Sequence, residues 1–312
     1  MSQDRHETLH LLVNLASGRG GGASLAELAE TRCAEAGKRL VLHAPSSPNG
    51  LVRMAEQALI AARNEGGVVA AAGGDGTVRT VAQVLYGSEV PLAVMPVGTF
   101  NFFARNHHIP EDVEGALQVA LSGRPQPVTL GEVNGQVFLI NASFGLYARA
   151  IQEREGRTSR FGRNRLVVIA STAASILAGH RSLRLELEVD GTARELRTPT
   201  VFVGNNALQL RHVALDVARC MKEHRLAVVV MRPVGSWGLL RLTVRGLLRM
   251  LEQEESLESF CADTLVVQHR RLGMSVALDG EILRIKPPLR FRSRPQAIRL
   301  MMPADSTGAG DE

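Results

Sequence analysis

Short apolar runs alternate with amphipathic stretches along roughly the first 120 residues of the chain. The apolar runs are unbroken, which indicates strands buried on both faces and therefore a parallel sheet between layers of helices. The expected strands cover residues 9–15, 38–44, 68–72 and 91–96, and the expected helices cover residues 22–37, 49–66 and 77–87. The pattern predicts an α/β fold class with an open three-layer N-terminal domain.

The pattern changes after Gly123. Later stretches are rich in strand-forming residues, alternate in places, and contain Asn-Gly and Asp-Gly pairs, which favour hairpin turns. These stretches are residues 128–145, 182–206 and 225–233, with helical candidates at 166–177 and 237–251. We therefore expect an α/β domain over residues 1–123, a mainly antiparallel β domain over 124–303, and a disordered tail over 304–312.

Composition narrows the functional classes. The chain has 312 residues, of which 45% are hydrophobic and 21% charged, so its length favours two folded domains. Its net charge of +5 is compatible with attraction to phosphate groups or an anionic membrane, whereas an aromatic content of 4% argues against a nucleic-acid partner. The most apolar stretch, 166–179, is shorter than the roughly 20 residues that a membrane span needs.

The three cysteines, Cys33, Cys220 and Cys261, are far apart in the sequence and odd in number. This spacing argues against a disulfide framework and against a cysteine zinc site. We therefore expect a cytoplasmic protein, and its positive charge is compatible with a peripheral contact at the inner face of an anionic membrane.

Three glycine-bearing loops follow predicted strands. Residues 73–77 read Gly-Gly-Asp-Gly-Thr, and similar loops cover 14–22 and 96–106. The carboxyl ends of parallel strands share one sheet edge, where open α/β sheets bind ligands. Glycines let backbone N–H groups approach a phosphate, and the next helix adds its positive N-terminal end. One such loop is equally compatible with a tight turn, but three together favour a phosphate site, although no Walker P-loop is present.

Four motifs in this chain occur in the order typical of one enzyme family. They are Asn-x-x-Ser-Gly-x-Gly at 14–20, Gly-Gly-Asp-Gly-Thr-Val at 73–78, Pro-x-Gly-Thr-x-Asn-x-x-Ala-Arg at 96–105 and Asp-Gly-Glu at 279–281. From Leu11 to about Pro303 the chain resembles the diacylglycerol kinase catalytic family, particularly the soluble bacterial lipid kinases, and more distantly the sphingosine kinases. The resemblance implies a two-domain kinase that uses ATP and Mg²⁺ to phosphorylate diacylglycerol or a similar lipid, with nucleotide held by the first domain and the active site in the interdomain cleft.

The resemblance also implies roles for individual residues. Asp279, with Glu281 beside it, supplies the catalytic carboxylate, and which of the two is the base stays open. Apart from the family, Asp-Gly at 279–280 indicates a plain hairpin turn, which can itself present both carboxylates. The residues implied to contact the nucleotide, its phosphates or their magnesium are Asn14, Ser17, Gly73, Gly74, Asp75, Gly76, Thr77 and Thr99.

Members of this family often carry an acidic segment that is linked to a second, structural magnesium. This chain keeps Asp216, but Lys222, Glu223 and His224 stand where acids and glycine are expected. The implied metal ligands are therefore Asp75 and, at a second site whose retention stays open, Asp216.

Several basic residues have two interpretations. Arg105, inside the third motif, is expected either to contact phosphate or to form an interdomain salt bridge. His107 and His108 follow the third loop and are compatible with a phosphate contact, but an exposed loop position is the commoner role of such histidines. The arginine-rich segments 152–165 and 237–251 are compatible with a membrane contact, but a solvated face is the commoner role of such segments.

Two other functions stay open. NAD kinases share Gly-Gly-Asp-Gly, but this chain lacks the downstream Asn-Glu pair with which that family grips its substrate. A non-catalytic nucleotide- or lipid-binding protein on the same scaffold would also keep the glycine loops. The oligomeric state is open as well, and a homodimer is compatible with the sequence.

Overall fold

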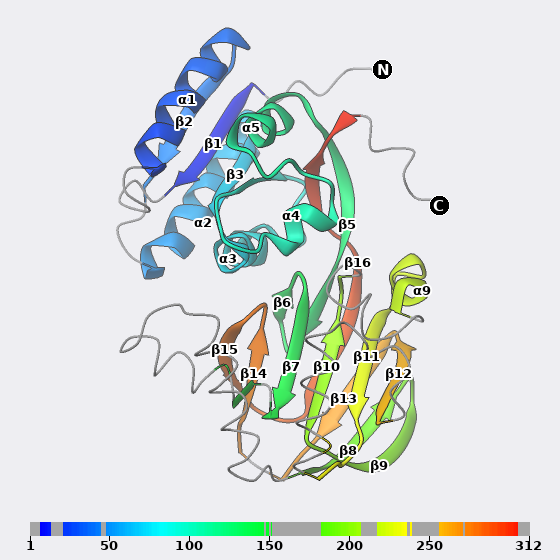
Figure 1. Ribbon diagram of the computed structural model, residues 1–312. Coiled ribbons are helices and arrows are strands. Elements are labelled where there is room, and N and C mark those ends of the chain that lie inside the picture. The colour runs from blue at the N-terminus through cyan, green and yellow to red at the C-terminus, as the bar shows by residue number, and fades with distance from the viewer. Residues whose placement is uncertain are drawn as a thin grey trace. The chain divides into compact units, whose positions relative to one another are not determined.

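The computed structural model divides into two compact units (Figure 1), Met1–Leu130 with Pro295–Glu312, and Gly131–Arg294. The residues that the structure describes are 7–13, 21–44, 48–146, 148–149, 151, 182–206, 217–235, 238, 256–270 and 272–304.

The first unit is built on a parallel sheet of strands in the order β2-β1-β3-β4. The strands are β1 (Thr8–Val13), β2 (Arg39–His43), β3 (Val68–Gly73) and β4 (Pro91–Pro96). Every residue of β1 and β4 is buried, as unbroken apolar runs require when helices cover both faces of a sheet. The parallel α/β arrangement predicted from the sequence is confirmed.

Helices pack in two pairs against this sheet, α1 with α5 and α2 with α3. The helices are α1 (Gly21–Glu35), α2 (Pro48–Glu65), α3 (Asp75–Leu85), the short α4 (Phe102–Asn106) and α5 (Val113–Ser122). In α3 the buried side chains include Val78, Val81, Ala82 and Leu85, the spacing of one helix face. Burying each such Val or Leu stabilises the fold by about 1.5–3 kcal/mol.

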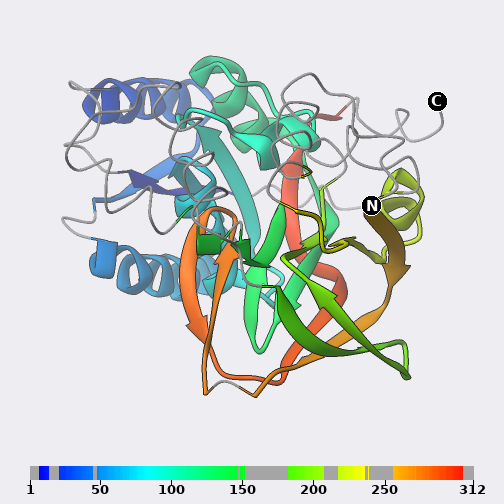
Figure 2. The same ribbon diagram turned by 60° about the horizontal axis from the view of Figure 1, so that its bottom comes forward.

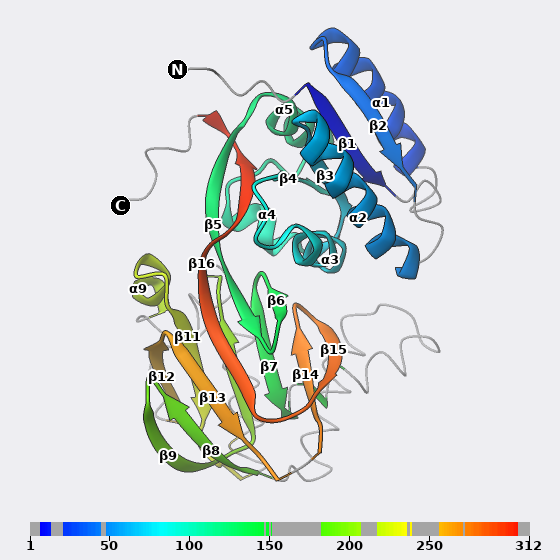
Figure 3. The same cartoon turned by 180° about the vertical axis from the view of Figure 1, so that it is seen from behind.

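The end of the chain returns to the first unit (Figure 3). Strand β16 (Leu289–Met302) pairs in parallel with β4, with Arg299 opposite Pro91 and Leu300 opposite Leu92. Strand β5 (Arg124–Val133) also pairs with β16. The sequence assigned residues up to 303 to the second domain, whereas these strand pairs group Pro295–Glu312 with the first unit.

The second unit contains an antiparallel sheet in the order β12-β11-β10-β7-β14-β15, and strands β13, β8 and β9 form a further antiparallel set. Its elements are β6 (Gln136–Phe138), β7 (Asn141–Gly145), β8 (Leu183–Val189), β9 (Thr192–Thr198), β10 (Thr200–Gly204), α9 (Val217–Lys222), β11 (Leu226–Met231), β12 (Leu257–Ala262), β13 (Thr264–Gln268), β14 (Met274–Leu278) and β15 (Glu281–Ile285). The predicted antiparallel β domain is confirmed.

Local sequence explains the hairpins of this unit. Asp190-Gly191 joins β8 to β9, and Asp279-Gly280 joins β14 to β15, drawn in orange in Figure 2. All four residues have positive φ, between 47° and 90°, the backbone of the tight hairpin turns that Asp-Gly favours. Strand β8 alternates buried and exposed residues and sends Leu185 toward the core that contains Phe291.

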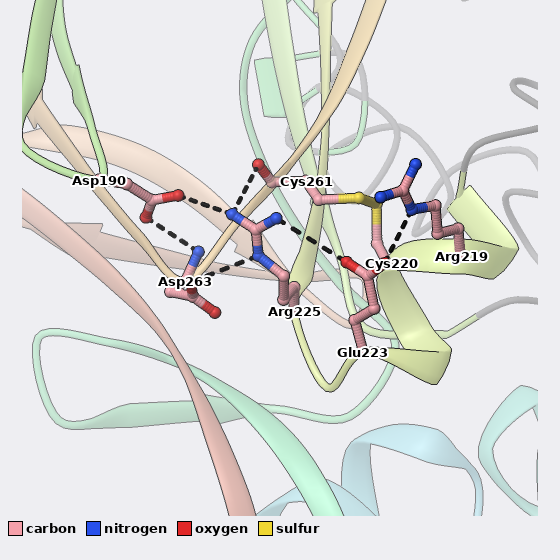
Figure 4. The surroundings of a disulfide bond; sticks show 7 residues. All are labelled: Asp190, Arg219, Cys220, Glu223, Arg225, Cys261 and Asp263. Atoms are coloured by element: carbon pink, nitrogen blue, oxygen red, sulfur yellow. Dashed lines mark hydrogen bonds and ion pairs between the residues drawn. A yellow bond between two sulfur atoms is a disulfide. The ribbon is translucent and has the colours of Figure 1, made fainter.

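The prediction of no disulfide is wrong. Cys220 of α9 and Cys261 of β12 form a disulfide bond, with Cα atoms 5.2 Å apart (Figure 4). The two residues are separated by 41 positions, but α9 packs on β12 and Ala227 of β11 pairs with Cys261. This folding brings the two sulfurs together. The cysteine argument for a reducing, cytoplasmic location therefore no longer holds.

Cys33 is the free cysteine within the described ranges, and it is buried in α1. Burial raises the pKa of its thiol, so it stays protonated and behaves as a small apolar group. The helical candidates 166–177 and 237–251 lie outside the described residues, apart from Gly238, and so does the tail from 305. Across the residues that the structure describes, no helix combines the length and apolar character needed to cross a membrane.

Candidate functional site

The Gly-Gly-Asp-Gly-Thr motif lies at the junction of β3 and α3. Gly73 ends the strand and pairs with Pro96, the last residue of β4. Gly74 is the N-cap residue of α3, and no side chain at this position accepts a hydrogen bond from the first N–H groups of the helix. The positive end of the helix dipole, which begins at Asp75, is therefore not capped by the N-cap residue. The loop between β3 and α3 thus combines the end of a strand, several glycines and the uncapped N-terminus of a helix. This combination is typical of anion-binding sites.

Close contacts favour glycine at Gly98, where two backbones approach each other, and at Gly73, where the Thr77 side chain lies nearby. A Cβ atom on Gly98 would lie 2.5 Å from the Cα atom of Gly74 and 2.8 Å from Oδ1 of Asn101. A Cβ atom on Gly73 would lie 2.4 Å from the Cβ atom of Thr77. The loops after β3 and β4 therefore lie in direct contact, as their shared sheet edge predicts.

Asn101 holds the loop after β4 in shape. It is buried and has a left-handed backbone with φ of 49°. Its Oδ1 accepts the N–H of Gly98 at 3.0 Å, and its Nδ2 donates to the carbonyl oxygens of Pro96 and Gly98, both at 3.1 Å. Sequence reasoning did not single out this asparagine, although it is part of the third motif. Its signal was an amide side chain in a loop between a strand and a helix.

Asp75 joins the two loops. Its carboxylate accepts the backbone N–H groups of Phe102 and Phe103, at 3.3 and 3.2 Å, and so caps the start of α4. A carboxylate at a helix N-terminus is favoured by the exposed N–H groups and the helix dipole. Asp75 therefore has a structural partner in addition to the phosphate or magnesium role that the family resemblance implies.

Two aromatic rings stack near the tip of the loop after β4, and one of them, Phe100, is exposed whereas Phe102 is half-buried. Thr99 is exposed, and so is Phe100, at 61% of its surface. The Phe100 ring stacks on Phe102, with centroids 5.6 Å apart and planes 5° from parallel. Sequence reasoning missed these two rings, whose signal was two aromatic residues inside a polar, glycine-bearing loop.

Two basic candidates beside α4 have local partners. Nε of Arg105 lies 3.5 Å from Oε1 of Glu111, and both side chains are about half exposed. This pair lies within the first unit, so it is neither of the two contacts expected for Arg105. His107 packs edge-on against Phe103, with centroids 4.7 Å apart. Burial, with a smaller effect from neighbouring His108, lowers the pKa of His107 to about 4, so His107 is neutral at pH 7.

Asp279, in the second unit, is both a turn residue and an anchor. Its carboxylate accepts the backbone N–H groups of Leu139, Ile140 and Asn141 at 2.7, 2.8 and 3.0 Å. Its own N–H donates to the carbonyl oxygen of Asn141 at 2.9 Å. The carboxylate thus holds the segment between β6 and β7 against the β14–β15 hairpin. The plain hairpin expected from Asp-Gly is present.

Glu281 has a different environment. It is the first residue of β15, pairs with Leu278 across the hairpin, and is exposed. Asp279 is half-buried, and backbone donors surround its oxygens. The two carboxylates of the Asp-Gly-Glu motif therefore have different access to solvent and to a ligand.

Asparagines extend the polar edge around Asp279. Asn205 follows β10, its N–H donates to the carbonyl oxygen of Ile140 at 2.8 Å, and its Nδ2 donates to that of Leu139 at 3.4 Å. Asn206 beside it is buried. Asn205 therefore supports the same backbone segment that Asp279 holds. Sequence reasoning missed both asparagines, and the signal was a pair of amides directly after an apolar strand.

In this chain, the described part of the segment that is acidic in the family does not offer the ligands that a metal ion needs. Oε1 of Glu223 lies 2.7 Å from Nε of Arg219, and its Oε2 lies 3.8 Å from Nη1 of Arg225 (Figure 4). The hydrogen bond from Arg219 lowers the pKa of Glu223. No cluster of three or more His, Cys, Asp or Glu suited to a metal occurs among the described residues. Arg225 instead bridges the carboxylates of Asp190 and Asp263 at 2.7 and 3.3 Å.

Three of the expected ligand residues, Asn14, Ser17 and Asp216, lie outside the described residues. The others fall into two groups. Gly73, Gly74, Asp75, Gly76, Thr77 and Thr99 lie on the adjoining loops after β3 and β4, and Asp279 and Glu281 lie on the β14–β15 hairpin.

Comparison with known proteins gives a consistent picture. Residues 8–133 match the model of the diacylglycerol kinase catalytic domain. A protein of Pseudomonas aeruginosa named probable lipid kinase YegS-like is 40% identical over 113 residues, which cover 36% of each chain. The protein of the same name from Cronobacter sakazakii is 39% identical over 87 residues and is covered over 29% of its length. That from Pseudomonas putida is 29% identical over 247 residues, 76% of this chain and 78% of the relative.

Solved structures match over nearly the whole chain. A putative diacylglycerol kinase from Bacillus anthracis superposes with a TM-score of 0.73 at 19% identity, covering 95% of this chain and 97% of that protein. A second structure of a putative diacylglycerol kinase from the same organism gives a TM-score of 0.71 at 18% identity, with the same coverage. At this identity the superposition establishes a shared fold. The family resemblance found in the sequence motifs is confirmed.

Proposed function

We propose, from the premise that residues 8–133 belong to the diacylglycerol kinase catalytic family, that this protein is an ATP-dependent lipid kinase. It would transfer the γ-phosphate of ATP to the hydroxyl group of diacylglycerol or a similar long-chain lipid. The observation that carries the proposal is the glycine motif at the uncapped start of α3, packed against the loop after β4. Such a helix start supports phosphate binding.

The first unit supplies the nucleotide site in this proposal. The N–H groups at the start of α3 would contact phosphates, and Gly73, Gly74 and Gly76 would allow close approach. The Thr77 hydroxyl lies next to Gly73 and would add a donor. Thr99, exposed on the adjoining loop, would hydrogen-bond nearby, and Asn14 and Ser17 would line the pocket.

Asp75 is suited to bind magnesium because hard cations prefer carboxylate oxygens. Hydrogen bonds from the backbone N–H groups of Phe102 and Phe103 already hold its side chain in place. Bound there, Mg²⁺ would neutralise charge on the phosphates during transfer. The Asp75 bonds to α4 would keep the carboxylate in one place whether or not nucleotide is bound.

The structure favours different roles for the two carboxylates of the Asp-Gly-Glu motif. Glu281 is exposed and would accept the proton of the lipid hydroxyl. The hydroxyl oxygen would bond to the γ-phosphorus, the bond from that phosphorus to the bridging oxygen would break, and ADP would leave. Asp279 would be a positioning residue, since its oxygens already accept three backbone N–H groups.

The test measures transfer of labelled phosphate from ATP, with magnesium, to micellar diacylglycerol, to other long-chain alcohols and to NAD. For Glu281→Gln we expect kcat to fall about 10²–10⁴-fold with ATP affinity unchanged, because a general base is lost. The control is Glu188→Gln, which removes an exposed carboxylate from β8 and should keep full activity. Asp279→Asn should lower kcat and also lower the melting temperature.

Other outcomes decide between the alternatives. Labelling of NAD alone would favour a NAD kinase. Binding of ATP without transfer to any acceptor would favour a non-catalytic binding protein. Full activity of Glu281→Gln would contradict the base proposed here.

A further inference from the structure

A hollow in the second unit is lined by arginines rather than by the family motifs. It has a volume of about 610 Å³ and lies where β7 ends, β8 and β14 begin and β15 ends. Its described lining residues are Gly145, Arg149, Leu183, His269, Arg270, Leu272, Gly273, Met274, Ser275 and Arg284. None of these is acidic. We call it the arginine hollow.

The arginines of this hollow have no acidic partner among the residues that the structure describes. Within the described part of the chain, Arg149, Arg270 and Arg284 form no ion pair and no hydrogen bond. Other arginines of the same unit are paired, for example Arg194 with Glu258 at 2.5 Å and Arg225 with Asp190 at 2.7 Å. Three unpaired guanidinium groups around one concavity produce a local positive potential that attracts an anion. Guanidinium is also the group best shaped to grip a phosphate.

Strands β8 and β9 beside the arginine hollow carry exposed charges of both signs. Arg184 lies directly opposite Arg197 in the strand register, and both are exposed. Like charges in such a pair are destabilising unless something else offsets them. The neighbouring hollow that these two arginines line shares His269 and Arg270 with the arginine hollow. It also contains Glu186 and Glu195, so the arginine hollow is the better phosphate site.

An exposed leucine lies at the same place. Leu272, between β13 and β14, lines the arginine hollow and is 93% exposed. An apolar side chain next to arginines matches a membrane interface, where the apolar group enters the acyl boundary and the cations meet lipid phosphates. A soluble phosphate ligand would make no use of this leucine.

We propose that the arginine hollow docks the protein on an anionic phospholipid bilayer, with a head-group phosphate held by Arg270 and Arg284 and with Leu272 inserted beside it. The hollow is distinct from the Asp-Gly-Glu turn within the same unit, because Met274 lies four residues, about 14 Å, from Leu278 along β14, and Arg284 lies three residues, about 10 Å, from Glu281 along β15. The proposal therefore goes beyond the kinase reaction, and its test requires no catalysis.

The experiment is sedimentation of the full-length protein with vesicles of phosphatidylcholine alone or with added phosphatidylglycerol. We expect binding to the anionic vesicles only, weakening as salt is raised. The double variant Arg270→Gln/Arg284→Gln should bind about 30-fold more weakly, which is the loss of affinity expected when two arginines are removed from an anionic membrane surface. Leu272→Ser should bind about tenfold more weakly, because a leucine no longer leaves water.

The matched control is Arg53→Gln/Arg63→Gln on α2, which removes the same charge from exposed positions and should change binding less than about twofold. Equal losses in the two double variants, or no loss in the first, would overturn the proposal. So would calorimetric binding of inorganic phosphate that depends on Arg270 and Arg284 without any vesicle binding. Thermal melting of every variant verifies folding, and activity on micellar lipid tests the kinase proposal separately.

Discussion

At the scale of single residues, Gly98 shows how the packing of two loops favours glycine at a motif position. Its missing side chain leaves room for the Cα atom of Gly74 and for Oδ1 of Asn101. A backbone neighbour cannot rotate away as a long side chain can. The identity of this glycine therefore follows from loop packing.

Gly98→Ala should destabilise the first unit by about 1–3 kcal/mol, the usual cost of overpacking. Gly74→Ala is the matched control, because a Cβ atom there would meet Gly98 Cα at 3.5 Å, an ordinary contact, and Gly74 has φ of −84°. Thermal denaturation measures both variants. Equal melting temperatures for the two would contradict the close approach of the loops.

At the scale of elements, the disulfide fastens α9 to the edge strand β12. α9 has only six residues, fewer than an isolated helix needs for stability. The disulfide between Cys220 and Cys261 closes a loop of 41 residues. The ion pairs of Arg225 with Asp190 and Asp263 lie beside this disulfide (Figure 4). This covalent link and these ion pairs occupy the segment in which the family resemblance placed a structural metal.

Reduction should lower the stability of the second unit, because opening the 41-residue loop restores entropy to the unfolded chain, a contribution of about 2–4 kcal/mol. Thermal melting with and without a thiol reductant measures it. Cys220→Ser/Cys261→Ser should melt like the reduced wild type and should respond no further to reductant, since the described thiol that is left, Cys33, is buried and unpaired. An unchanged wild-type transition under reduction would contradict this.

At the scale of the whole molecule, the chain returns to its first unit after building the second. Ala297, Ile298, Leu300 and Met301 of β16 are buried, and Leu300 pairs with Leu92 of β4. The family match ends at residue 133, well before this strand. The matched segment is therefore only part of a folding unit.

A fragment of residues 1–130 should fold poorly, because it lacks the buried side chains of β16 and leaves the edge of β4 unpaired. Fusing residues 289–304 to it through a flexible linker should restore a cooperative melting transition, followed by circular dichroism. The same fusion with Leu300→Asp is the control and should not restore it. A fragment that melts as cooperatively without β16 would refute the prediction.

Much of the fold was predictable from sequence because its causes are local. Unbroken apolar runs marked the parallel strands, and Asp-Gly pairs marked two hairpins whose positive φ the structure contains. The glycine motif was placed correctly between β3 and α3 because a strand, a turn and a helix each have their own short-range pattern. The order of the motifs along the chain indicated the family.

Tertiary structure alone decided the contacts between residues far apart in the sequence. It paired Cys220 with Cys261 in a disulfide and brought the carboxylate of Asp75 to the N-terminus of α4. It also placed the N–H groups of residues 139–141 around the carboxylate of Asp279. It also returned β16 to β4 and gathered unpaired arginines around Leu272. Periodicity and turn preference report whether a residue is buried or turning, but they do not report which distant residue it meets. That partner is chosen when packed strands and helices bring their loops together.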